Sequence, residues 1–302
     1  MSQSGKYYHN TSINFKLVNS SGCGVSNAKI NLIFSNGQKT SLNTDTNGNA
    51  IYLLKFLPGK YSINANVDAD NISVNNYTGS VNILKIPITL KTAKLTTYYK
   101  SGKLFNVKIT NSITGKALSG IKVKLKVFTG KKSKTVMLTT NSKGIASYKA
   151  SLLQSGSHKI LISTNDNRVN SISKSSLIKI NKRNLFIYPV PVKDKDFDGV
   201  VIAVVVKKTM KFANGVKLKL KIYSGKKYKT VYLVSGYSKD EKVDGTCGWM
   251  TNMLSKGSHK IIITTVNKND RGYAKTKIVV KKLYKKSQRF SMVFSKGKLS
   301  FC

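Results

Sequence analysis

The chain has 302 residues, in which 53 Lys and Arg stand against 11 Asp and Glu, for a formal net charge of +42. Its one Glu, Glu241, and three dispersed His leave few residues for acid–base catalysis, and no GxGxxG, Walker or HExxH pattern occurs. We therefore expect a non-enzymatic protein whose positive field attracts polyanions. The longest apolar run, 200–206, is far too short to span a bilayer.

Sequence matches at a nearly fixed spacing divide the chain into repeats. Residues 129–136 (TGKKSKTV) recur as 224–231 (SGKKYKTV), and 156–160 (GSHKI) recur as 257–261. This spacing of about 95–100 residues is typical of a tandem array of domains. We predict repeats at 1–91, 92–182 and 183–283, followed by the start of a truncated fourth repeat at 284–302.

The first repeat, 1–91, has a net charge of only +5, against +17 for 92–182 and +20 for 183–302. Residues 4–6 (SGK) match 101–103, which follow the first predicted strand of the second repeat. The first repeat is therefore expected to lack its opening strand, and a polyanion is expected to contact the later repeats most.

The second repeat predicts short strands separated by turns every 8–12 residues, and no stretch has a convincing helical period. This pattern favours an all-β fold, an antiparallel sandwich of immunoglobulin-like type, and we expect the repeats to follow one another like beads on a string. The predicted strands are 94–99, 104–110, 122–128, 134–140, 145–153, 158–164 and 175–181.

Alternation is strictest at 122–128 (KVKLKVF), which predicts valine and leucine on one face and a lysine row on the other. The row leads into a hairpin tip with further lysines, and both features recur in the third repeat. We predict that these lysines together form a polyanion-binding stripe, with a solvated face as the alternative. The candidate residues are Lys122, Lys124, Lys126, Lys131, Lys132, Lys134, Lys217, Lys219, Lys221, Lys226, Lys227 and Lys229.

The strand after 141–144 aligns across all three repeats and explains one cysteine. Ala50, Ala146 and Cys247 share one column, and an aromatic residue follows two positions later in each repeat. We predict that both columns face the core and that Cys247 acts as a small apolar residue. His158 and His259 also occupy equivalent turns, which predicts a structural role. Cys23, Cys247 and Cys302 form neither a zinc motif nor an even disulfide framework.

The third repeat contains a candidate calcium loop at 194–199 (DKDFDG). Asp194, Asp196 and Asp198 have the alternate spacing that lets carboxylates surround a hard cation. Val205 stands where an EF-hand needs a bidentate Glu, so we weigh a β-turn calcium site against an acidic turn that balances a basic repeat. The third repeat also carries an insertion at 238–245. No other cofactor is predicted.

The last segment, 290–301, is similar to 95–106 in its run of β-forming residues and its turn before Gly-Lys-Leu. We therefore expect this chain to be a piece of a longer protein. No signal peptide is visible after Met1, and in a piece this carries little weight.

Residues 44–50 (TDTNGNA), 57–63 (LPGKYSI), 140–146 (TNSKGIA) and 153–160 (LQSGSHKI) resemble the bacterial Ig-like repeats of surface adhesins. They are closest to the adhesin-like repeat proteins of methanogenic archaea. The resemblance covers nearly the whole chain and implies an exported, extracellular surface protein engaged in attachment. It does not extend to the excess of positive charge.

Three functions stay open at this stage. The favoured one is a surface protein whose lysines bind an anionic cell-wall or surface polysaccharide, or a host or partner cell surface. The second is a protein that binds nucleic acid through phosphates, for which Arg is scarce and no exposed aromatic platform is expected, because the aromatics alternate into core positions. The third is a passive spacer.

Overall fold

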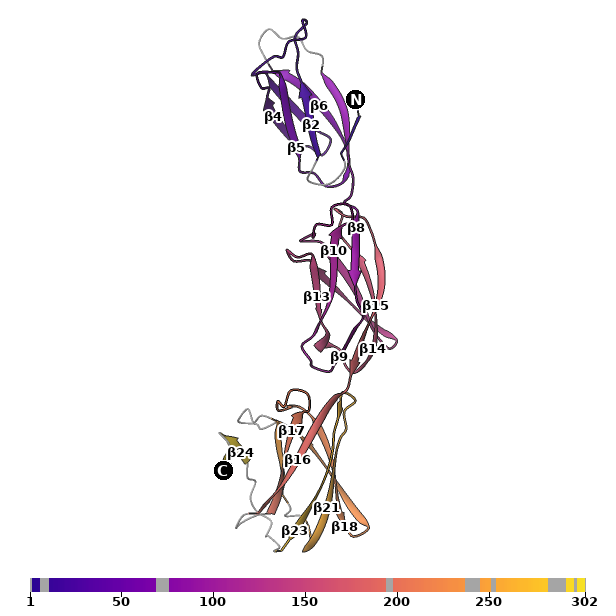
Figure 1. Ribbon diagram of the computed structural model, residues 1–302, viewed down its shortest axis with the longest axis vertical. Coiled ribbons are helices and arrows are strands. Elements are labelled where there is room, and N and C mark those ends of the chain that lie inside the picture. Colours follow the sequence, from indigo (N-terminus) through magenta and orange to yellow (C-terminus); the bar gives the residue numbers. More distant parts are fainter. Residues whose placement is uncertain are drawn as a thin grey trace. The chain divides into compact units, whose positions relative to one another are not determined.

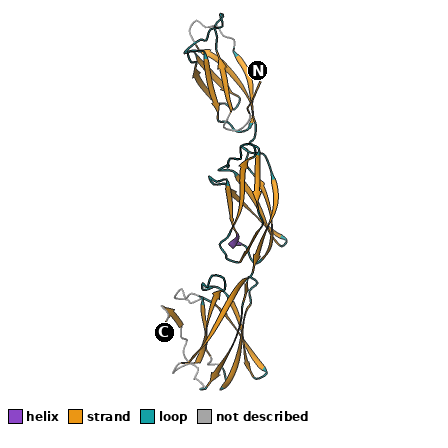
Figure 2. Ribbon diagram, viewed as in Figure 1, coloured by secondary structure: helices purple, strands orange, loops and turns teal. Residues whose placement is uncertain are grey.

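The computed structural model describes residues 2–5, 11–68, 76–193, 198–236, 245–250, 254–281, 292–295 and 298–301 (Figure 1). Strands make up almost all of the regular structure, and the helical element in these ranges is a single 3-10 turn, Ala150–Leu152 (Figure 2). In the same ranges, no helix has the length and apolar character needed to cross a membrane. The all-β prediction is confirmed.

The first repeat has a five-stranded sheet in the order β1-β7-β6-β3-β4 and a two-stranded sheet of β2 and β5. Its core gathers buried side chains of both sheets, among them Ile13, Leu32, Phe34, Leu54 and Val81. The strands are β1 (Ser2–Gly5), β2 (Thr11–Lys16), β3 (Lys29–Phe34), β4 (Lys39–Asn43), β5 (Asn49–Leu54), β6 (Gly59–Asp68) and β7 (Tyr77–Ile83).

The second repeat has a three-stranded sheet, β13-β10-β8, and a five-stranded sheet, β12-β11-β14-β15-β9. Its strands are β8 (Ile88–Thr92), β9 (Leu95–Tyr98), β10 (Leu104–Asn111), β11 (Lys122–Thr129), β12 (Lys132–Thr139), β13 (Ile145–Lys149), β14 (Gly156–Thr164) and β15 (Ser173–Asn181). The predicted strand at 145–153 is too long, because the 3-10 turn follows Lys149. Strand β8 crosses the predicted boundary at residue 91 and pairs with β10.

The opening strands of these two repeats can be compared directly. Strand β9 runs parallel to β15 at a sheet edge, and β1 runs parallel to β7 in the same way. Residues 2–5 thus occupy the edge position in the first repeat that β9 occupies in the second. The strand without a counterpart in the described part of the first repeat is β8.

The third repeat has two four-stranded sheets, β20-β17-β16-β22 and β19-β18-β21-β23. Both sheets contribute to one core that includes Val200, Ile202, Leu218, Leu220 and Ile261, and this defines a sandwich. The strands are β16 (Arg183–Lys193), β17 (Asp198–Val206), β18 (Lys217–Ser224), β19 (Lys227–Val234), β20 (Thr246–Met250), β21 (Gly257–Thr265), β22 (Asp270–Arg271) and β23 (Tyr273–Val280).

A final hairpin joins β24 (Met292–Ser295) and β25 (Lys298–Phe301). The matching strands of the second repeat, β9 and β10, lie in different sheets. Local sequence similarity between these segments therefore does not carry over into the same pairing.

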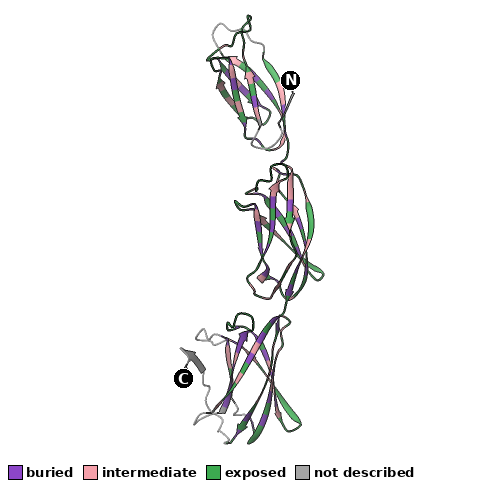
Figure 3. Ribbon diagram, in the orientation of Figure 1, coloured by how far each residue is buried: buried purple, intermediate pink, exposed green. Residues whose placement is uncertain are grey.

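Burial alternates along the strands that bear the lysines, as Figure 3 shows. In β11, Val123, Leu125 and Val127 are 0%, 0% and 2% exposed, and the lysines between them are exposed. The same alternation occurs in β18, where Leu218, Leu220 and Ile222 are buried. The structure is thus a tandem array of immunoglobulin-like sandwiches, as the sequence pattern predicts.

A buried hydroxyl binds the backbone just before β3, β11 and β18, which are the equivalent strands of the three repeats. In the second repeat, Thr140 Oγ1 donates to the carbonyl of Leu118 at 2.6 Å and accepts from the amide of Ile121 at 2.9 Å. Thr44 makes the equivalent pair of bonds in the first repeat, and Ser235 does so in the third. In the second and third repeats, these bonds fix where the lysine row begins.

A glycine with positive φ precedes each of the equivalent strands β5, β13 and β20, at φ 77° for Gly48, 71° for Gly144 and 65° for Gly245. A Cβ at Gly144 would overlap the carbonyl oxygen of Ile109 on the neighbouring strand. Glycine is needed here both for the backbone conformation and for the close approach.

Candidate polyanion-binding faces

The lysine rows lie on the outer faces of two equivalent sheets. Lys122, Lys124 and Lys126 project from β11 on the side opposite its buried residues, and Lys217, Lys219 and Lys221 do so from β18. Residues two apart on a strand are about 6.5–7 Å apart, so each row is a ladder of ammonium groups. We call these surfaces the second and third outer faces.

Strand register shows which residues surround the row on the third outer face. Residues directly opposite one another across an antiparallel pair share a face. Lys219 lies opposite Tyr232 of β19 and Thr264 of β21, and Lys221 lies opposite Thr230 and Ile262. Tyr223 lies opposite Tyr228 and Lys260, and Lys260 in turn lies opposite Lys277 of β23.

The second outer face has the same lysines with different neighbours. Lys124 lies opposite Met137 of β12 and Ser163 of β14, and Lys126 lies opposite Thr135 and Leu161. A shallow depression of about 500 Å³ next to the row is lined by Lys124, Lys126, Leu161, Ile162, Ser163, Ser173, Lys174 and Ser175.

The first repeat does not carry a comparable row. The outward positions of β3 that correspond to Lys122, Lys124 and Lys126 are Lys29, Asn31 and Ile33. The amine of Lys29 lies 3.8 Å from the carboxylate of Asp68, which neutralises part of its charge. The uneven charge along the sequence therefore has a structural counterpart in the outer faces.

The hairpin-tip lysines do not continue the rows. Each hairpin has a two-residue loop with glycine first, Gly130 at φ 61° and Gly225 at φ 63°, as a type II′ turn requires. Lys134 lies opposite Val127 and Lys229 lies opposite Ile222, so both share the face of the core residues. Lys132 and Lys227 lie two residues earlier on the same strands and therefore share that face. Lys131 and Lys226 occupy the two-residue loops.

The structure thus divides the twelve predicted lysines into six on the outer faces and six at the tips. The tips belong to β12 and β19, which are edge strands, and lysines at such edges oppose pairing with another chain. Sequence reasoning missed Lys260, Lys275 and Lys277, although the alternation in 273–280 carries the signal for the last two.

Aromatic rings accompany the lysines, contrary to the expectation that the aromatics all enter the core. Tyr228, Tyr232 and Tyr273 are 51%, 65% and 63% exposed. Lys221 Nζ lies 4.5 Å from the ring centroid of Tyr228, and Lys260 Nζ lies 5.5 Å from that of Tyr223. On the second outer face, Lys126 Nζ lies 5.4 Å from the ring of Phe128. Cation–π attraction orients these ammonium groups.

Within the described residues, no carboxylate forms an ion pair with a lysine of either outer face. The ion pairs in the described ranges join Lys29 to Asp68, Arg168 to Asp166 and Arg183 to Asp270, and none includes a lysine of either outer face. Every row lysine therefore repels its neighbours, and an anionic ligand would relieve that repulsion.

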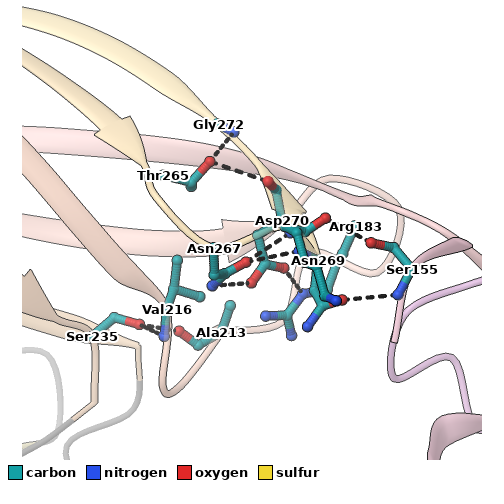
Figure 4. A network of polar contacts seen from close by, with 11 residues as sticks. Ser155, Arg183, Ala213, Val216, Ser235, Thr265, Asn267, Asn269, Asp270 and Gly272 are labelled. Carbon is teal, nitrogen blue, oxygen red and sulfur yellow. Dashed lines mark hydrogen bonds and ion pairs between the residues drawn. The ribbon is translucent and has the colours of Figure 1, made fainter. Parts of the chain in front are cut away.

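Two of the ion pairs are structural and secure the loop before the last strand. Arg183 Nε donates to Asp270 at 2.7 Å, with both side chains buried, and Asn267 donates to the other Asp270 oxygen (Figure 4). In the second repeat, Arg168 bonds Asp166, and this hydrogen bond holds the pKa of Asp166 well below its usual range. The Arg168 side chain is 29% exposed, against 8% for Arg183.

The two equivalent histidines are buried and bonded to backbone, which confirms their structural role. His158 Nε2 lies 2.9 Å from the Gln154 carbonyl, and His259 Nε2 lies 2.9 Å from that of Ser255. Cys247 packs against the third core as predicted, and burial raises its pKa to about 12.

The calcium prediction falls largely outside the described residues. Asp194 and Asp196 lie in the undescribed segment 194–197, and the backbone of Asp198 pairs with that of Lys193. The insertion at 238–245 also lies outside the described residues, except for Gly245. Among the residues that are described, no group of three His, Cys, Asp or Glu is arranged to hold a metal ion.

The chain has neighbours among solved structures. No protein-family profile matches it, and no curated protein does. It is similar to a tetra-tandem repeat in the extending region of a large adhesion protein, at 12% identity and TM-score 0.37, over 91% of this chain and 72% of that one.

Two further neighbours have comparable scores. One is invasin, a bacterial integrin-binding protein, at 12% identity and TM-score 0.35, over 92% of this chain and 58% of that one. The other is the Yersinia pseudotuberculosis adhesin InvE, at 11% identity and TM-score 0.34, over 65% and 64%. These similarities assign neither a partner nor a site residue to this chain.

Proposed function

We propose that this chain is part of a non-enzymatic, extracellular surface protein of the adhesin-like type, and that its second and third outer faces bind anionic polymers of an envelope or a partner cell. The observation that carries the proposal is the pair of equivalent lysine rows, which have no carboxylate partner in the described ranges. The resemblance of 44–50 and 153–160 to archaeal adhesin-like repeats supports the location.

The mechanism is multivalent charge recognition. Each outer face offers several ammonium groups at regular spacing, and the attraction of any one group is modest in water. A polymer held by one face meets the other as an intramolecular contact, so the apparent affinity exceeds that of either face. Aromatic rings beside the lysines reduce the freedom that the side chains lose on binding.

Binding of duplex DNA through phosphates is the rival function. The outer faces are positively charged, but their cationic residues are lysines, and none of the four arginines lies in the rows. Base recognition favours the bidentate guanidinium group, so DNA would be bound without sequence preference. A competition experiment separates the two functions.

The test is co-sedimentation of the full chain with intact cell-wall sacculi at about 150 mM salt, where charges are screened beyond roughly 8 Å. Duplex DNA is added as a soluble competitor. We expect retention on the wall despite excess DNA. Release by DNA would replace the envelope function with general polyanion binding.

Two variants of equal net charge locate the binding surface. The face variant changes Lys122, Lys124, Lys126, Lys217, Lys219 and Lys221 to Gln. The tip variant changes Lys131, Lys132, Lys134, Lys226, Lys227 and Lys229 to Gln. We expect the face variant to lose most of the binding and the tip variant to lose less. Equal loss would mean that net charge alone decides, and unchanged binding in both would leave the spacer function.

A further inference from the structure

The third outer face carries tyrosines at positions where the second has other residues. Tyr228 and Tyr232 of β19 align with Ser133 and Met137 of β12 in the repeated segment. Both tyrosines project beside lysines and are at least half exposed. An exposed tyrosine gives a large, rigid and amphipathic contact area at a small cost in conformational entropy.

These tyrosines extend across the whole sheet. One row of directly opposed residues crosses all four strands and has a tyrosine at each end: Tyr232, Lys219, Thr264 and Tyr273. Adjacent strands are about 4.8 Å apart, so the row spans about 14 Å. An extended chain of a few sugar units covers this length.

A second feature of the third outer face points to an anion. Lys260 and Lys277 lie directly opposite one another on β21 and β23. Like charges in this position destabilise a sheet. Together with Tyr223 and Lys275, they line a shallow depression of about 640 Å³. A carboxylate in the depression would lie between ammonium groups that otherwise repel each other.

We propose that the third outer face binds an acidic polysaccharide, a chain of sugars that carry carboxylates. The ammonium groups pair with the carboxylates, the rings of Tyr232 and Tyr273 pack against the C–H faces of the sugars, and their hydroxyls bond sugar hydroxyls. This inference rests on the proposed function and adds selectivity to it: the second outer face recognises charge, and the third recognises charge on a sugar.

The geometry favours a sugar chain over single-stranded nucleic acid. The rings of Tyr223 and Tyr228 are 5.4 Å apart and tilted by 45°, which does not provide parallel surfaces for successive bases. Lysine ammonium groups already lie over one face of each ring. The remaining ring edges and hydroxyls suit a ligand rich in hydroxyl groups.

The test measures affinity by calorimetry with the full chain. The probes are oligogalacturonate, polyglutamate and single-stranded oligothymidylate of matched charge, with neutral dextran as a further probe. The variant Tyr228→Ser with Tyr232→Met introduces the residues of the second repeat without changing net charge. We expect its affinity for oligogalacturonate to fall about five-fold or more, and its affinity for polyglutamate to change less than about two-fold.

The reciprocal variant, Ser133→Tyr with Met137→Tyr, guards against a loss caused by misfolding. It should raise affinity for oligogalacturonate and leave that for polyglutamate unchanged. Equal effects on both probes, tighter binding of dextran than of oligogalacturonate, or a larger tyrosine effect on oligothymidylate would overturn the inference. If the face variant keeps its affinity for every polyanion, the proposed function itself fails. If only the tyrosine variants have no effect, the sugar selectivity alone fails.

Discussion

The outer faces of the second and third repeats share one set of lysines and differ in what surrounds them. Lys124 lies between Met137 and Ser163, and the equivalent Lys219 lies between Tyr232 and Thr264. The residues beneath both rows are buried aliphatic side chains, so the fold does not require the difference. The comparison shows how a repeated scaffold can keep one charged ladder and vary its chemistry at the adjoining strands.

The largest expected effect concerns the structural ion pairs, whose arginines differ in burial between the two repeats. Asp270→Ala leaves the buried Arg183 guanidinium without its partner, and we expect the third repeat to lose about 3–5 kcal/mol of unfolding free energy. Trp249, the only tryptophan, packs against the third core, so its fluorescence reports on unfolding of this repeat. Asp166→Ala is the matched control and should leave the Trp249 transition in place. A shift below about 1 kcal/mol for Asp270→Ala would contradict the structural role of the pair.

The next effect concerns the buried hydroxyl that bonds the backbone just before the lysine row, which belongs to Thr140 in the second repeat and Ser235 in the third. Thr140→Val keeps the shape of the side chain but leaves the Leu118 carbonyl and the Ile121 amide without their partner. We expect a loss of about 1–3 kcal/mol, confined to the second repeat. Hydrogen exchange of the β11 amides measures this loss. Ser235→Ala should instead speed the exchange of the β18 amides in the third repeat. Unchanged protection in both variants would show that water replaces the hydroxyl.

A smaller effect appears in acid and concerns Asp166. Its folded pKa lies below the unfolded value of about 3.9, so its contribution to stability is present above that pH and is lost as the pH falls through the folded pKa. We expect the second repeat to weaken below about pH 4 and Asp166→Asn to remove that part of the pH dependence. Exchange rates of β11 amides across this range test it. An unaltered pH profile in Asp166→Asn would rule the carboxylate out as the cause.

The smallest effect concerns a pair of opposed lysines on the third outer face. Lys277→Thr removes one of two like charges that face each other across β21 and β23. We expect a gain of about 0.2–1 kcal/mol at low salt that fades as salt is added, and weaker binding of polyanions. Trp249 fluorescence in urea follows the stability. Destabilisation by Lys277→Thr would mean that the lysine makes contacts that outweigh the repulsion.

Most of the fold could be predicted from local patterns. Short-range signals correctly predict two strands and their hairpins. These signals are the alternation in 122–128 and 217–223 and the turn glycines Gly130 and Gly225. The edge pairing of β1 with β7 could not be predicted, because it depends on a distant strand. The predicted strand at 145–153 was too long because apolar residues recur beyond Lys149, through the 3-10 turn.

The candidate site was predictable in part. Each lysine row follows from period two within one strand, but its neighbours depend on the sheet order, which brings Lys260 and Lys277 beside Tyr223. The face of the tip lysines depends on the register across the hairpin, which places Lys134 opposite Val127 and Lys229 opposite Ile222. The exposed tyrosines depart from the usual burial of aromatic residues, so hydrophobic patterning alone does not predict them.

Carbodiimide cross-linking tests the central claim most directly, because it couples lysines to carboxylates in contact with them. The full chain is cross-linked to oligogalacturonate at about 150 mM salt, and the modified lysines are mapped by mass spectrometry. We predict modification at Lys219, Lys221, Lys260 and Lys277 first, then at Lys124 and Lys126, with little at Lys39 or Lys60 of the first repeat. Modification spread evenly over exposed lysines of all three repeats would contradict binding by the outer faces.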